Sequence, residues 1–361
     1  MSRWITVSRR DPEFTAYLDG SFSHTHRALP VRSLNVDTNS EEVTFEIVPI
    51  SEIQRPPLIK VALQAVRASS LLLSAGPMLA TFFYALSRGY EYSPLITFSS
   101  FFGVLAFHMS VNLFNDYGDH MKGRDRVRPR GGSRVIQNGW VAAITLRRAA
   151  WTLMTIAAFF GVPAIFLSTS TIHPVAVIAV LAGLVGLEFA FQKFRLKYRG
   201  FAELLAFALT GPLLCLGFGW AMTGQLVPDF ALLGCIYGAI SLMYFHSVNF
   251  ENIMTDSQAG VSTWATRAGF DSSKSFFYFT AALTVTFALT FAVFFGRDMA
   301  WVIALLAIGA MTYPLIEKVR SVASPLSSAL SRLRLNVIWF SCSTTLILIG
   351  TFIAMAVRGV A

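Results

Sequence analysis

Two short polar segments carry side chains that could hold a divalent cation. In the first segment, residues 111–125, the donors are Asn112, Asn115, Asp116 and Asp119. Their spacing of three and four residues places all four on one face of a helix. The second segment, residues 248–260, repeats the pattern 137 residues later with Asn249, Asn252 and Asp256. Carboxylate and amide oxygens are hard ligands that suit Mg²⁺, so the pattern predicts a magnesium site made of two halves.

Basic residues accompany both segments. Lys122, Arg124, Arg126, Arg128, Arg130 and Arg134 follow the first one, and Lys197, Arg199 and Arg267 lie in other loops. Proteins commonly hold Mg²⁺ with one or two carboxylates together with substrate phosphates, and cationic side chains bind phosphate oxygens strongly. The combination therefore indicates a diphosphate site. The 32 Phe residues of the chain suit a long apolar tail, so the ligand that we predict is a polyprenyl diphosphate.

Composition indicates the class of protein. Of the 361 residues, 54% are hydrophobic and 14% are charged, with a mean hydropathy of +0.57, whereas soluble proteins carry roughly 25% charged residues. This indicates a polytopic membrane protein with no nucleic-acid partner. The three Cys residues lie in apolar runs and predict neither a disulfide framework nor a metal cluster.

Uncharged intervals predict an all-α bundle of nine transmembrane helices, because a helix needs roughly 20 apolar residues to cross a bilayer. The intervals are 67–88, 91–116, 148–168, 174–188, 203–229, 229–251, 274–297, 298–317 and 334–358. The polar sequence from Ser168 to Pro174 separates the third helix from the fourth. The two Asp-containing segments then lie at the ends of helices two and six.

Lys and Arg residues are distributed unequally among the loops that join these helices. With the N-terminus inside the cell, 26 of the 29 Lys and Arg residues lie on the cytosolic side, and only Arg88, Arg297 and Arg358 lie outside. Loops rich in Lys and Arg stay on the cytosolic side of a membrane. We therefore expect an integral multi-pass protein of the cell inner membrane, with the N-terminus and the active site in the cytosol.

Residues 1–55 are polar and mixed in charge, unlike the rest of the chain. We expect a cytosolic N-terminal extension of residues 1–55, followed by a nine-helix domain of residues 56–361. Residues 42–50 alternate weakly and predict one strand of a small cap, with a poorly ordered tail as the alternative. Residues 58–66 predict an amphipathic helix on the membrane surface. The sequence identifies no protein partner.

Several of these motifs resemble those of the UbiA-type intramembrane aromatic prenyltransferases, most closely the 1,4-dihydroxy-2-naphthoate polyprenyltransferase branch of menaquinone synthesis. Residues 112–125, which begin Asn-Leu-Phe-Asn-Asp-Tyr-Gly-Asp, are similar to the first Asp-rich motif of the family. Residues 249–260 are similar to the second motif, and residues 132–139 and 196–203 are similar to loops of that branch. The resemblance covers residues 67–355. It implies Mg²⁺-dependent transfer of a prenyl group from a polyprenyl diphosphate to an aromatic acceptor, in quinone or related lipid synthesis.

The resemblance also implies roles for individual residues. The implied metal ligands are Asn112, Asn115, Asp116, Asp119, Asn249, Asn252 and Asp256. The implied diphosphate-binding residues are Lys122, Arg134, Lys197 and Arg199. The implied catalytic residues are Asp116, Asp119, Asp256, Lys122 and Tyr198. Tyr198 would face the prenyl cation or the acceptor, and the metal would stabilise the leaving diphosphate as a Lewis acid.

One position departs from the family pattern. The second motif commonly has two aspartates four residues apart, and the first of them is replaced here by Asn252. Either the second site binds metal more weakly, or Glu251 substitutes through a local unwinding of the helix, or catalysis is altered, which includes an inactive lipid-binding homologue. A cation-coupled membrane transporter is a further alternative, because acidic repeats in two halves of a chain can mark transport sites.

Overall fold

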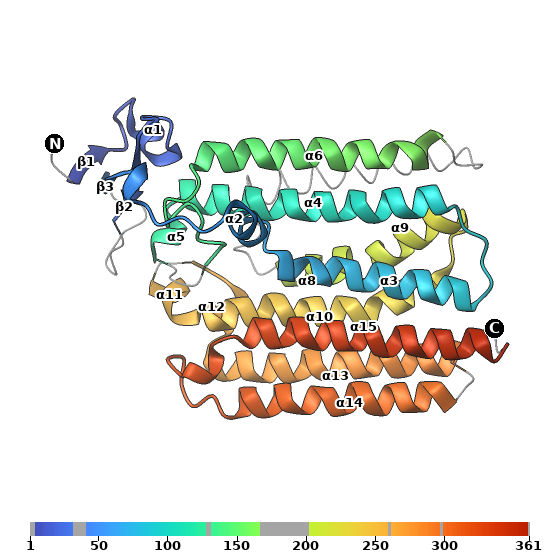
Figure 1. The fold of residues 1–361 in the computed structure, drawn as a ribbon. Helices are drawn as coiled ribbons and strands as arrows, with labels where there is room; N and C mark the ends of the chain where they lie inside the picture. The colour runs from blue at the N-terminus through green and yellow to red at the C-terminus, as the bar shows by residue number, and fades with distance from the viewer. Residues whose placement is uncertain are drawn as a thin grey trace. The chain divides into compact units, whose positions relative to one another are not determined.

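The computed structural model describes residues 4–31, 41–127, 131–166, 202–258, 261–296 and 299–359. They form two compact units, whose helices and strands are labelled in Figure 1. Unit 1 comprises Met1–Ala68, Ala106–Ile156 and Thr255–Val261, and unit 2 comprises Ser69–Leu105, Ala157–Met254 and Ser262–Ala361. The first polar segment and Asp256 therefore belong to unit 1, whereas Asn249 and Asn252 belong to unit 2.

Unit 2 is a helix bundle in which most helices are long and apolar. Its described helices are α3 (Leu72–Ser87), the first part of α4 (Pro94–Met121), the second part of α6 (Ala143–Phe166), α8 (Ala202–Thr210), α9 (Pro212–Thr223), α10 (Pro228–Glu251), the short α12 (Trp264–Ala268), α13 (Phe270–Phe295), α14 (Met299–Arg320) and α15 (Leu333–Val357). Helix α10 packs against α8, α9, α13 and α15. It buries large aromatic side chains such as Phe230 and Tyr237. The helix that leads to the second polar segment is thus the central one of this unit.

Glycines allow α10 to approach the break between α8 and α9. A Cβ atom on Gly211 would lie 2.5 Å from the Cα atom of Gly238, and one on Gly234 would lie 2.6 Å from the Gly211 carbonyl oxygen. Such close backbone approach through small residues is typical of helices packed in membranes. Pro212 at the first turn of α9 interrupts the helix, because proline lacks the N–H donor. The close packing places Glu203, on α8, within hydrogen-bond reach of α10.

Unit 1 contains a small antiparallel sheet at the start of the chain. Its strands are β1 (Trp4–Ser8), β2 (His26–Pro30) and β3 (Glu42–Pro49), in the order β1-β3-β2, with α1 (Phe14–Asp19) following β1 in the chain. Val43 and Phe45 of β3 are buried together with Val7 and Leu18. The strand predicted at residues 42–50 is confirmed, and the alternative of a poorly ordered tail is wrong for the described residues. The all-α prediction is wrong here too, because an alternating strand can bury one face only by pairing with other strands.

The rest of unit 1 surrounds the end of α4. It comprises α2 (Leu58–Ala65), the second part of α4, α5 (Arg124–Val127), the first part of α6 (Ala143–Phe166) and most of α11 (Ile253–Gln258). Val61 and Ala65 of α2 are buried with Leu113 of α4, whereas Leu58 and Ile59 are exposed. The predicted amphipathic helix is confirmed. Its position at a membrane surface stays a prediction.

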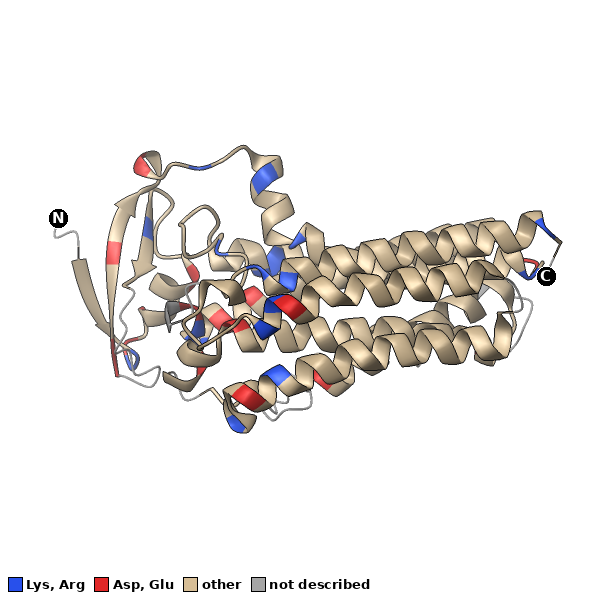
Figure 2. Ribbon diagram, turned by 90° about the horizontal axis from the view of Figure 1, so that it is seen from below, with Lys and Arg blue, Asp and Glu red and all other residues tan. Residues whose placement is uncertain are grey.

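Seven segments within the described part of the chain are long and apolar enough to cross a membrane. They are Ala68–Ser87, Pro94–Met121, Glu203–Thr223, Pro228–Glu251, Phe270–Phe295, Met299–Arg320 and Ser328–Val357. They coincide with seven of the nine predicted helices, and Figure 2 shows that their charged residues lie near the helix ends. Helix α6 overlaps the third predicted helix, and the fourth falls within residues 167–201, outside the described residues. The total of nine stays a prediction.

Candidate active site

Helix α4 carries the first polar segment without interruption as far as Met121. The chain then turns at Gly123, whose φ of 74° favours glycine. Asn112 and Asp116 are buried, while Asp119 is partly exposed. Burying a carboxylate is costly unless it has partners. The partners of Asp116 therefore determine whether its buried carboxylate can remain charged and bind a cation.

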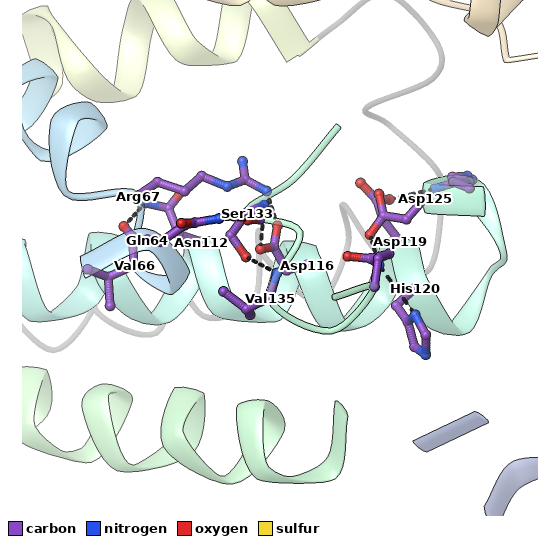
Figure 3. Close-up of polar contacts among 12 residues, drawn as sticks. Gln64, Val66, Arg67, Asn112, Asp116, Asp119, His120, Asp125, Ser133 and Val135 are labelled. Atoms are coloured by element: carbon purple, nitrogen blue, oxygen red, sulfur yellow. Dashed lines mark hydrogen bonds and ion pairs between the residues drawn. The ribbon is translucent and has the colours of Figure 1, made fainter. Parts of the chain in front are cut away.

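Asp116 is only 3% exposed and has two partners within unit 1 (Figure 3). The Arg67 guanidinium forms an ion pair with its Oδ1 atom, and the backbone N–H of Ser133 donates to its Oδ2 atom at 2.9 Å. Arg67 has a positive φ of 52°, which is uncommon for a residue other than glycine. Asn112 donates from Nδ2 to the carbonyl of Val66 at 2.9 Å and so holds the same turn. This turn presents a cationic side chain to Asp116.

The loop after α5 packs against the same carboxylate. Gly132 has a φ of +61°, and a Cβ atom there would lie 3.0 Å from Asp116 Oδ1 and 3.6 Å from Asp125 Oδ2. A backbone that passes this close to two side chains requires glycine. Gln64 of α2 donates from Nε2 to the carbonyl of Ser133 at 2.8 Å and fixes the loop. The carboxylates of Asp116 and Asp125 therefore both lie close to the backbone at Gly132.

Asp125 experiences the charge of both other carboxylates. Burial, and after it the negative charges of Asp119 and Asp116, raises the pKa of Asp125 to about 7. The positive charges of Arg67 and Arg134 act in the opposite direction and lower the pKa. The three carboxylates repel one another, and a bound cation would relieve that repulsion.

Arginine and amide side chains hold the outer part of this cluster. Arg124 Nη1 lies 3.3 Å from Asp119 Oδ1, and Arg134 Nη1 donates to the backbone carbonyl of Asp125 at 2.7 Å. Gln137 donates from Nε2 to Asp125 Oδ2 at 2.9 Å. The cluster thus offers carboxylates to a cation and guanidinium groups to an anion, which is the donor set that a metal-bound diphosphate needs.

The second polar segment differs from the first because its helix is interrupted. Helix α10 ends at Glu251, α11 begins at Ile253, and Asn252 lies between them. Asp256 on α11 is fully buried and belongs to unit 1, whereas Asn249 belongs to unit 2. The helix therefore does not continue through this segment, as the alternative of a local unwinding requires. In the chain, the break at Asn252 lies between Asn249 on α10 and Asp256 on α11.

Two glutamates near the second segment have different partners in unit 2. The carboxylate of Glu251 accepts a hydrogen bond from the backbone N–H of Arg334 at 2.8 Å and lies 3.7 Å from its Nε atom. Glu203 is buried and accepts from Asn249 Nδ2 at 2.6 Å through Oε1. The carboxylate of Glu251 thus contacts Arg334, and its substitution for the missing aspartate stays a prediction. Glu203 instead supplies a carboxylate beside Asn249.

The carboxylates of unit 1 fit Mg²⁺ by donor type and charge, without forming a complete cage. Among the described residues, no three His, Cys, Asp or Glu side chains form a group that could hold a metal ion. Mg²⁺ needs only one or two carboxylates where phosphates and waters complete its octahedral shell. The contacts of Arg67 with Asp116 and of Arg124 with Asp119 leave the cluster neutralised by cations. A divalent cation that arrives with an anionic ligand could replace this neutralisation.

Comparisons with known proteins assign the chain to a family. A sequence model of the UbiA prenyltransferase family matches residues 75–356. The chain belongs to this family. The 1,4-dihydroxy-2-naphthoate octaprenyltransferase of Escherichia coli (strain K12) is 21% identical over 210 residues, which are 57% of this chain and 68% of that protein. The protein of the same name from Haemophilus influenzae is 24% identical over 226 residues, or 60% of this chain and 72% of that protein.

Solved structures show that the fold is that of the UbiA family. The UbiA homolog of Aeropyrum pernix K1 superposes with a TM-score of 0.61 at 13% identity, over 80% of this chain and 98% of that one. A digeranylgeranylglyceryl phosphate synthase gives a TM-score of 0.56 at 17% identity, over 82% and 99%. The Archaeoglobus fulgidus homolog bound to GPP and Mg²⁺ gives 0.54 at 12% identity, over 82% and 99%. The family resemblance seen in the sequence is confirmed, and this chain is an integral multi-pass membrane protein and a prenyltransferase.

In this UbiA family prenyltransferase, part of the predicted site lies in unit 1. Unit 1 contains the predicted residues Asn112, Asn115, Asp116, Asp119, Lys122, Arg134 and Asp256. Lys197, Tyr198 and Arg199 lie outside the described residues. Two residues of the cluster are given no role by the sequence: Arg67 lies outside the motifs, and Gln137 lies within residues 132–139 without a predicted function. Arg67 lies at the start of the first uncharged interval, where its charge indicates only the end of a membrane-spanning helix.

Proposed function

We propose that this protein transfers a prenyl group from a polyprenyl diphosphate to an aromatic acceptor in an Mg²⁺-dependent reaction. The observation that carries the proposal is the cluster of Asp116, Asp119 and Asp125 beside Arg67 and Arg134, near the end of a membrane-length helix. The relatives named 1,4-dihydroxy-2-naphthoate octaprenyltransferase and the homolog solved with GPP and Mg²⁺ support this substrate class. By analogy with these relatives, we assign to this protein an acceptor of the dihydroxynaphthoate type and a role in the synthesis of menaquinone or a related quinone.

Metal ligation is assigned to the carboxylates and amides of both segments. They are Asp116, Asp119 and Asp256, with Asn112, Asn115, Asn249 and Asn252. Mg²⁺ held by these residues would act as a Lewis acid on the diphosphate. Until it binds, Arg67 neutralises the buried carboxylate of Asp116. Arg67 thus compensates the buried charge of Asp116, which would be strongly unfavourable without a partner.

Basic side chains are assigned to the diphosphate. They are Lys122, Arg134, Lys197 and Arg199. The reaction breaks the allylic C–O bond, and the electron pair leaves with the diphosphate. The freed carbon forms a C–C bond with the aromatic ring, which then loses a proton, or CO₂ where a carboxylate sits on the attacked carbon. Fixed positive charges stabilise the leaving group, and Tyr198 is assigned to the face of the prenyl cation.

Glu203 is assigned to the weaker half of the site. Its hydrogen bond to Asn249 orients the amide so that the amide oxygen is directed away from Glu203. Its second carboxylate oxygen is buried and has no hydrogen-bond partner within the described residues. The carboxylate of Glu203 would supply the negative charge that is missing because Asn252 stands in place of an aspartate. The site as a whole is assigned to the cytosolic face of the cell inner membrane.

The proposed function can be tested with purified protein in lipid nanodiscs. The protein is incubated with radiolabelled polyprenyl diphosphate, Mg²⁺ and a panel of aromatic acids, with and without EDTA. Prenylated product that disappears with EDTA is the expected result. Cation flux in proteoliposomes without release of diphosphate would favour a transporter. Bound diphosphate that is never cleaved would favour a lipid-binding homologue.

A further inference from the structure

The N-terminal cap, residues 4–31 and 41–54, packs tightly against the segments that carry the acidic cluster. Met121, at the end of α4, packs against the core of the cap formed around Phe45. Gly20 has a φ of +81°, and a Cβ atom there would lie 3.0 Å from the Cβ atom of Ala142. The Trp140 indole donates from Nε1 to the carbonyl of Gln54 at 3.1 Å. All these contacts lie within unit 1.

A chain of hydrogen bonds runs from the cap to the acidic cluster. His120 is buried next to Asp119 on α4 (Figure 3), and its Nε2 atom lies 2.8 Å from the carbonyl oxygen of Leu18 in the cap. A carbonyl can only accept, so Nε2 carries the proton and Nδ1 is the acceptor when the imidazole is neutral. Gln137 Nε2 lies 3.4 Å from that Nδ1 atom and also donates to Asp125 Oδ2 at 2.9 Å.

We infer that the cap is a positioning element of the active site, acting on Asp125 through His120 and Gln137. This inference rests on the proposed function, because only an Mg²⁺-dependent reaction requires the acidic cluster to bind a cation. Asp125 lies close enough to Asp116 and Asp119 for their charges to raise its pKa. Carboxylates that repel one another need partners to hold them in one arrangement. The Leu18 carbonyl fixes the imidazole of His120, which contacts Gln137, and Gln137 in turn donates to Asp125.

The cap lies outside the part of the chain that the family model matches. The family match begins at residue 75, so neither Leu18 nor any other cap residue belongs to it. His120 and Gln137 do lie within the matched range. A side chain at the end of a family helix therefore uses a carbonyl that the extension provides. The cap thus positions a side chain of the active site in this enzyme.

Variants of the full chain in nanodiscs separate this role from general stability. Gly20→Val places a side chain against Ala142, and Gly89→Val is the matched control, because Gly89 has a similar φ of +69° and nothing within 4 Å. His120→Ala removes the imidazole, and His120→Gln keeps a donor and an acceptor. Binding of Mn²⁺, followed by its electron paramagnetic resonance signal, reports on the cluster independently of activity. Hydrogen exchange of the β3 amides reports whether the cap remains docked.

We expect Gly20→Val and His120→Ala to raise the dissociation constant of Mn²⁺ by about three- to tenfold, the effect of one lost hydrogen bond. Gly89→Val should bind Mn²⁺ like the wild type, and His120→Gln should recover most of the loss. An unchanged Mn²⁺ affinity in His120→Ala would overturn the inference, as would an unchanged affinity in Gly20→Val with fast exchange in β3. Wild-type protein without Mg²⁺-dependent release of diphosphate would instead contradict the proposed function.

Discussion

The ion pair between Arg67 and Asp116 should contribute to stability as long as no metal is bound. Asp116 is 3% exposed, whereas the Arg67 side chain is 30% exposed. Removing one partner of a buried ion pair costs about 3–5 kcal/mol. The remaining hydrogen bond from Ser133 and the partial exposure of Arg67 reduce this cost, so we expect Arg67→Met to lower the free energy of unfolding by about 2–3 kcal/mol.

A double-mutant cycle measures this effect directly. Arg67→Met, Asp116→Asn and the double variant are unfolded reversibly in mixed micelles, and we expect a coupling energy of about 2 kcal/mol. Mg²⁺ should reduce the loss in Arg67→Met, because a ligand that binds only the folded state stabilises it. Arg10→Ala is the control, since Arg10 and Glu41 form an exposed pair that should contribute little. A coupling below about 0.5 kcal/mol would refute the reasoning.

Three further variants test the two halves of the site. Asn252→Asp adds a carboxylate and should lower the Mg²⁺ concentration for half-maximal transfer by about three- to tenfold, as one charge-assisted contact would; an unchanged Mg²⁺ requirement would show that this position does not weaken the site. Gly132→Ala should lower the transfer rate at least tenfold, since its Cβ atom would lie 3.0 Å from Asp116 Oδ1 and displace that carboxylate. Normal activity in this variant would show that the reaction does not depend on the position of Asp116. Glu251→Gln should lower stability by about 1–3 kcal/mol through its contact with Arg334 and leave the Mg²⁺ requirement unchanged, whereas a higher requirement would make Glu251 a ligand after all.

The sequence predicts the features of this protein that depend on local pattern. Uncharged intervals locate the helices because a bilayer imposes a minimum apolar length. The spacing of Asn112, Asp116 and Asp119 places them on one helix, since α4 continues to Met121. The alternation of residues 42–50 identifies β3 because a strand buries every second side chain.

Features that depend on contacts between distant residues could not be predicted in this way. Arg67 lies 49 residues from Asp116 in the chain, and no motif joins them. The spacing of the second segment equals that of the first, so it does not show that the helix breaks at Asn252; local unwinding is only one of several alternatives there. β1 and β2 pair with the two edges of β3. Each is only five residues long, which is too short to show a clear alternation of its own.

The role of Asp116 is the central claim, because the matching position of the second segment is Ile253 and offers no other carboxylate. The most direct measurement compares the rate of Mg²⁺-dependent diphosphate release from a polyprenyl diphosphate in wild-type protein and in Asp116→Asn. We expect the folded variant to be slower by about 10²–10³-fold, the effect of losing one electrostatic group at a transition state. An Asp116→Asn variant that keeps more than about a tenth of the wild-type rate at the same Mg²⁺ concentration would contradict the account.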